Sequence, residues 1–113
     1  MTMRLRLDKP WQPLTAETAQ RLPGQLGVYQ VADGHGTVLY IGQAGARSPF
    51  GLRSELHREF TERGAGCQFR VEVNQQYRSR WFELLMLHQA DHGSLPADNA
   101  KDPPPNLGRL SPA

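Results

Sequence analysis

The chain has 113 residues, enough for one folded domain but too few for a second hydrophobic core. Its net charge of +2 and pI near 9.0 permit contact with nucleic acid without requiring it. The sequence has no apolar run of membrane-spanning length and no secretory signal at its start, and its single cysteine, Cys67, excludes an internal disulfide. We therefore expect a cytoplasmic protein that makes no contact with a membrane.

Hydrophobic periodicity and turn residues predict an α+β domain. Thr15 is placed to cap a first short helix, Gly34 and Gly36 favour a tight reversal between two strands, and Gly93 marks the end of the last helix. In chain order the pattern predicts helix, strand, strand, helix, strand and helix, at residues 16–21, 27–32, 37–41, 51–63, 67–73 and 76–92. We expect a small, mainly antiparallel three-stranded sheet flanked by helices. The expected organisation is a lead-in with a short helix at residues 1–22, the domain at 23–107 and a tail at 108–113.

Two short segments, Gly27-Val28-Tyr29 and Tyr40-Ile41-Gly42, form the most informative motif of the chain. Folding the predicted hairpin brings the two tyrosines into one neighbourhood. With the Gln43-Ala44-Gly45 that follows, this pattern resembles the GIY-YIG nuclease family, whose first motif is usually Gly-Ile-Tyr. The resemblance covers roughly residues 23–107 and implies the family's fold and a metal-dependent endonuclease that hydrolyses phosphodiester bonds in DNA.

The same resemblance implies five catalytic residues: Tyr29, Tyr40, Arg53, Glu83 and Asn106. Glu83 is expected to hold Mg²⁺ or Mn²⁺, Arg53 to neutralise a phosphate, and Tyr29 to take a proton from water. Tyr40 is then expected to orient that water or the phosphate, the reverse assignment of the two tyrosines being the alternative. Asn99 competes with Asn106 for the last position. Phosphate contacts are expected from Gly42, Gln43, Arg47 and His57.

Each of these residues also has a structural interpretation. The tyrosines fit packing on a sheet, and Glu83 has the spacing to pair with Arg80 on the same helix. The arginine position departs from the family pattern, because aligning the helix places Glu55 where the family has arginine. This departure favours a catalytically silent nucleic-acid-binding module as the first alternative, and a small protein-interaction domain remains the second.

The expected partner is DNA, structured or branched, in repair or recombination, with a protein partner as a further source of specificity. His88 and His92 lack the glutamate of a zinc-protease helix, so we do not assign them a metal.

Overall fold

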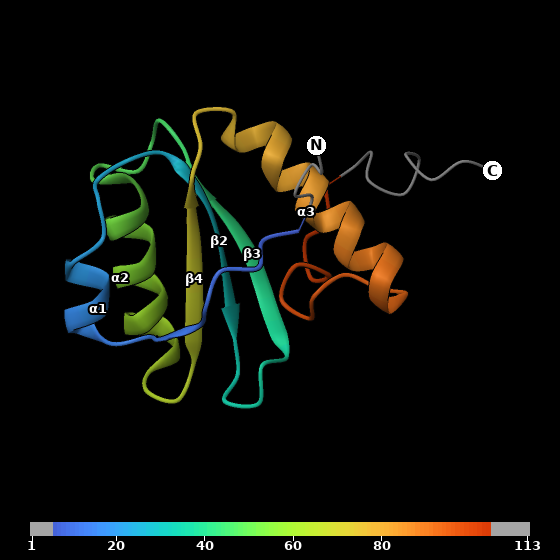
Figure 1. The fold of residues 1–113 in the computed structure, drawn as a ribbon, viewed down its shortest axis with the longest axis horizontal. Coiled ribbons are helices and arrows are strands. Elements are labelled where there is room, and N and C mark those ends of the chain that lie inside the picture. The colour runs from blue at the N-terminus through green and yellow to red at the C-terminus, as the bar shows by residue number, and fades with distance from the viewer. Residues whose placement is uncertain (1–5, 105–113) are drawn as a thin grey trace.

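The computed structural model describes residues 6–104, which form a four-stranded antiparallel sheet with three helices (Figure 1). The strands lie in the order β1-β4-β2-β3. The strands are β1 (Gln12–Pro13), β2 (Gly27–Ala32), β3 (Val38–Ala44) and β4 (Gln68–Val73), and the helices are α1 (Ala16–Gln20), α2 (Gly51–Arg63) and α3 (Tyr77–His92). The predicted α+β class and antiparallel sheet are confirmed.

The sheet has one strand more than the sequence predicted. β1 pairs with the first residues of β4, and Leu14 adds a backbone hydrogen bond to Cys67. A two-residue strand that ends in Pro13 carries no alternation of apolar and polar residues, so its pairing cannot be read from its own pattern.

Helices cover both faces of the sheet, with α1 and α2 on one face and α3 on the other (Figure 1). Alternate residues of β2 show this division. Tyr29 and Val31 belong to the hydrophobic cluster that includes Leu52 and Leu56 of α2, whereas Val28 packs in the cluster of α3. The face of any strand residue therefore follows from its place in the alternation.

Local signals in the sequence define the ends of the elements. Thr15 caps α1 through a reciprocal capping box with Thr18, and Gly93 ends α3 in the left-handed conformation. In the β2–β3 turn the Asp33 carboxylate accepts hydrogen bonds from the backbone N–H groups of His35 and Thr37. None of the helices within residues 6–104 combines the length and the apolar character needed to cross a membrane.

The segment after α3 lies against β3, which forms one of the two edges of the sheet. The Asp98 N–H donates to the Leu39 carbonyl at 3.0 Å, and the side chain of Asn99 bonds both backbone groups of Ile41. This irregular segment therefore covers an edge that would otherwise expose unpaired backbone groups.

Candidate functional site

The two motif tyrosines meet on the face of the sheet that α2 covers. Their ring centroids lie 6.0 Å apart. Tyr29 pairs with Gly42 across the β2–β3 ladder, and a Cβ at Gly42 would overlap the Tyr29 ring. The glycine of the second motif thus makes room for the tyrosine of the first. Tyr29 is only 1% exposed, whereas Tyr40 is half-buried.

Helix α2 directs a buried carboxylate at the Tyr29 hydroxyl. Tyr29 donates a hydrogen bond of 2.8 Å to Oε2 of Glu59, which is 2% exposed. Arg63 donates to the other oxygen of Glu59 at 2.7 Å, and Arg58 Nη2 lies 3.3 Å from the Tyr29 hydroxyl. Arg63 also pairs with Asp98 at 2.8 Å. We call this group, Tyr29, Arg58, Glu59, Arg63 and Asp98, the tyrosine–carboxylate network.

The surroundings of both phenols favour the protonated form. Burial, together with the negative charge of Glu59, raises the pKa of Tyr29 well above its usual value. Burial and Glu59 also raise the pKa of Tyr40. In this arrangement Tyr29 is a hydrogen-bond donor, which is the reverse of what a general base at neutral pH requires. The geometry is that of a buried tyrosine–carboxylate pair bonded by arginines that reach the surface of the domain.

The arginine at the tyrosines is not the one expected. Arg53 lies toward α1, where its Nε donates to the Leu22 carbonyl at 2.9 Å. Arg58, one turn and a half further along α2, contacts Tyr29 instead. Glu55, which the resemblance aligns with the arginine of the GIY-YIG pattern, accepts hydrogen bonds from Ser48 and Arg58.

Glu83 lies on α3, across the sheet from the tyrosines. Its partner is Arg80, which also bonds Glu72 of β4. Glu72 pairs with Val28 in the ladder and so shares the α3 face with it, opposite Tyr29. The structural interpretation of Glu83 as a partner of Arg80 is therefore what the structure shows.

These positions do not fit a divalent metal held by Glu83 beside the tyrosines. The Glu83 carboxylate is engaged by Arg80, and the sheet separates it from Tyr29. Among residues 6–104, no three histidine, cysteine or acidic side chains come together as a group able to hold a metal ion. We assign no step to a metal.

Of the two candidate asparagines, Asn99 lies within the described residues. Asn106 lies outside the described residues. Asn99 is buried, and its amide accepts from the Ile41 N–H at 2.8 Å and donates to the Ile41 carbonyl at 3.0 Å. Trp81 donates to the same carbonyl. Asn99 thus fixes the middle of the second motif to the C-terminal segment.

The expected phosphate-contacting residues are dispersed. Gly42 is buried under Tyr29, and Gln43 lines a hollow of about 350 Å³ beside α3. Arg47 is exposed in the loop before α2, and His57 is exposed on α2 itself. Of the predicted residues, His57 and Arg53 line the same hollow.

That hollow lies between α1 and α2 and measures about 530 Å³. Phe50, 61% exposed, stands at its rim, and Arg53, His57 and Arg58 line it. We call it the α1–α2 surface, which consists of Gln20, Phe50, Arg53, Ser54, His57 and Arg58.

Four residues of these two groups were not among those predicted from the sequence: Phe50, Arg58, Glu59 and Arg63. A signal for Glu59 was present, because it follows Leu52 and Leu56 on the apolar stripe of α2. An acidic residue at that position with Arg63 four residues later indicates a buried, paired carboxylate. Phe50 gave no comparable signal.

Comparisons with known proteins give a family without an activity. Searches of curated proteins and of solved structures found no match. A family model described as a domain of unknown function, DUF7508, matches residues 3–91. Since this match spans most of the chain, the protein belongs to the DUF7508 family.

Proposed function

We propose that this chain binds single-stranded or locally unpaired DNA through the α1–α2 surface and does not hydrolyse it. The observation that carries the proposal is an exposed phenylalanine, Phe50, at one hollow with Arg53 and His57, two basic side chains that form no ion pair within residues 6–104. Aromatic rings that stack on bases, combined with cations that follow the phosphates, are the usual means of binding single strands.

The pattern of ion pairs favours the α1–α2 surface over the tyrosine–carboxylate network as the site that binds DNA. Arg53 donates to a neutral carbonyl, and neither it nor His57 forms an ion pair within residues 6–104. The arginines of the network are paired with Glu55, Glu59, Glu62 and Asp98. A cation without an acidic partner can neutralise a phosphate without first breaking an internal pair. Arg47 is exposed in the loop before α2 and likewise forms no ion pair within residues 6–104. It adds a further positive charge near the start of α2.

A binding role without hydrolysis agrees with the state of the motif residues. Tyr29 is buried as a donor to Glu59, and Glu83 lies on the other face of the sheet with Arg80. The phosphodiester chemistry implied by the family resemblance needs a proton acceptor and a charged group at one point of the substrate. The tyrosine pair instead supports the position of α2, and with it the surface that α2 carries.

The test is fluorescence anisotropy with a labelled oligonucleotide of about 16 nucleotides, long enough to span one domain. The logarithm of the binding constant should fall linearly with the logarithm of the salt concentration. The magnitude of this slope should decrease by about 0.7 when Arg53 is changed to Gln, because one phosphate contact on a single strand is lost. Phe50→Ala should weaken binding by about 1–3 kcal/mol with little change in slope.

Two matched variants serve as controls. Val73→Ala truncates another exposed apolar side chain, and Arg78→Gln removes another exposed arginine, both outside the α1–α2 surface. Both controls should bind like the wild type. Equal losses in Phe50→Ala and Val73→Ala would contradict the assignment of the surface, and absence of binding at low salt would contradict the function.

Endonuclease activity is the second candidate, and the proximity of Tyr29 and Tyr40 with Arg58 in contact favours it. It would require Tyr29 to leave Glu59. Incubation of supercoiled and branched DNA with Mg²⁺ or Mn²⁺ separates the candidates. Cutting that is lost in both Tyr29→Phe and Glu83→Gln would replace the binding proposal with the enzyme.

A further inference from the structure

The outer edge of β4 is paired over only part of its length. β1 covers Gln68 and Phe69, and the chain before β1 then leaves the edge. The last residues of the strand, 70–73, pair with β2 alone. At the far end Val73 is 45% exposed. The sheet therefore ends on this side in a short unpaired edge.

The direction of the backbone groups at this edge follows from the ladder. Asn74 donates its N–H inward to the Leu26 carbonyl, and Leu14 bonds the outward carbonyl of Cys67. Because backbone groups alternate along an antiparallel strand, Val71 and Val73 direct their N–H and C=O groups outward. Within residues 6–104 these outward groups form no hydrogen bond. An edge of this kind offers a template for another strand.

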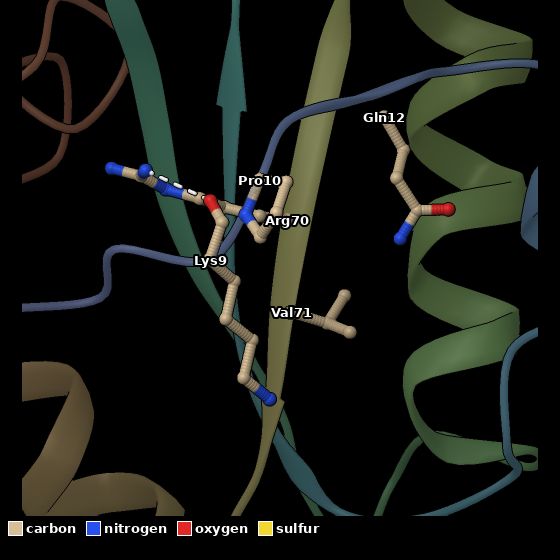
Figure 2. Close-up of a pocket in the computed structure, with 5 residues that line it drawn as sticks. All are labelled: Lys9, Pro10, Gln12, Arg70 and Val71. Carbon is tan, nitrogen blue, oxygen red and sulfur yellow. Dashed lines mark hydrogen bonds between the residues drawn. The ribbon is translucent and has the colours of Figure 1, made fainter.

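A hollow of about 410 Å³ adjoins the same edge (Figure 2). Its lining contains two cations, Lys9 and Arg70, and no acidic residue. Arg70 stacks on the Trp11 ring at 4.0 Å and donates to Gln30 and to the Lys9 carbonyl. Figure 2 shows the Lys9 side chain lying alongside β4, with Gln12 set apart toward α2. Lys9 and Arg70 form no ion pair within residues 6–104, although the charge of Asp8 acts on Arg70.

We propose that the free edge of β4 binds an extended acidic segment of another protein by strand addition. The outward groups of Val71 and Val73 supply the backbone hydrogen bonds, and Lys9 and Arg70 select acidic side chains. A second copy of the chain is disfavoured as the occupant, because its Lys9 and Arg70 would lie close to the same two cations of the first copy and repel them. Side chains of the bound strand would alternate, with acidic residues beside Arg70 and apolar residues beside Val71 and Val73.

The probe is a labelled, end-capped peptide of alternating valine and aspartate, with an alternating valine and lysine peptide as the charge control. In a titration followed by NMR of the ¹⁵N-labelled full chain, the amides of Val71 and Val73 should shift with the aspartate peptide. The lysine peptide should bind at least about tenfold more weakly, as expected for lost charge-assisted contacts.

Two substitutions of Val73 separate the contribution of its backbone N–H from that of its side chain. Val73→Pro removes the outward N–H and leaves the inward ladder bonds in place, and it should weaken binding by about tenfold. Val73→Ala keeps the N–H and should bind within about threefold of the wild type. The melting temperature of each variant checks that it is folded.

Three results would overturn the inference: no shift at Val71 and Val73, equal affinity for the two peptides, or unchanged binding in Val73→Pro. Sedimentation velocity addresses the rival occupant. A dimer that forms as concentration rises and disappears in Val73→Pro would assign the edge to a second copy instead. DNA binding by Val73→Pro should be unchanged, so failure here and failure of the proposed function are separable.

Discussion

Changing Glu59 to Gln tests whether the tyrosine–carboxylate network stabilises the fold. The substitution keeps the shape of the side chain and removes a charge that contacts Tyr29 at 2.8 Å and Arg63 at 2.7 Å. Loss of one partner from a fully buried ion pair costs about 3–5 kcal/mol. The Arg63 side chain is 19% exposed and keeps Asp98, so we expect about 2–3 kcal/mol.

The assay is urea unfolding at neutral pH followed by circular dichroism. Glu62→Gln is the control, because Glu62 pairs with Arg58 on the same helix but its side chain is 60% exposed, and it should change stability by less than about 0.5 kcal/mol. Tyr29→Phe should cost about 1–2 kcal/mol, since it removes the hydrogen bond to Glu59 and the longer one from Arg58 and leaves the carboxylate paired with Arg63. A Glu59→Gln protein as stable as Glu62→Gln would refute the structural role of the network.

Three further predictions concern the motif and its surroundings. Gly42→Ala should lower stability by about 2–3 kcal/mol in urea unfolding, because the added Cβ overlaps the Tyr29 ring; near wild-type stability would contradict this packing. Asn99→Ala should cost about 2–3 kcal/mol in the same assay and accelerate hydrogen exchange at Ile41, whose N–H loses its acceptor; unchanged exchange would be the contrary result. Because the pKa of Tyr29 is raised in the folded state, the unfolded chain ionises first, so stability should hold below about pH 10 and fall above it. Tyr29→Phe should reduce that fall when urea unfolding is compared at about pH 9 and pH 11, and an equal fall in both proteins would exclude Tyr29 as its source.

The elements of the fold were predictable because each carries a local signal. The capping box at Thr15, the apolar stripe of α2 and the stop at Gly93 depend on residues close in the chain. The strand β1 was not predictable in this way. Its two residues pair with β4 across more than fifty positions of sequence, and that contact leaves no periodicity in either partner.

The site shows a similar division between local and distant information. Motif spacing correctly predicted that Tyr29 and Tyr40 would meet, since a hairpin joins them. The direction of side chains from α2 depends on helix phase. A shift of five residues, from Arg53 to Arg58, moves the guanidinium from the Leu22 carbonyl to the Tyr29 hydroxyl. The side of the sheet on which α3 and Glu83 lie is determined by packing between distant segments, and no local pattern in the sequence predicts it.

The most direct test of the proposed function is an NMR titration of the ¹⁵N-labelled full chain with a short single-stranded oligonucleotide. The proposal predicts that amide shifts concentrate at Phe50, Arg53 and His57 on the α1–α2 surface. The chemical shifts of the amides around Glu83 on α3 should not change. Shifts centred on α3 and the C-terminal segment, or no shifts at low salt, would contradict it.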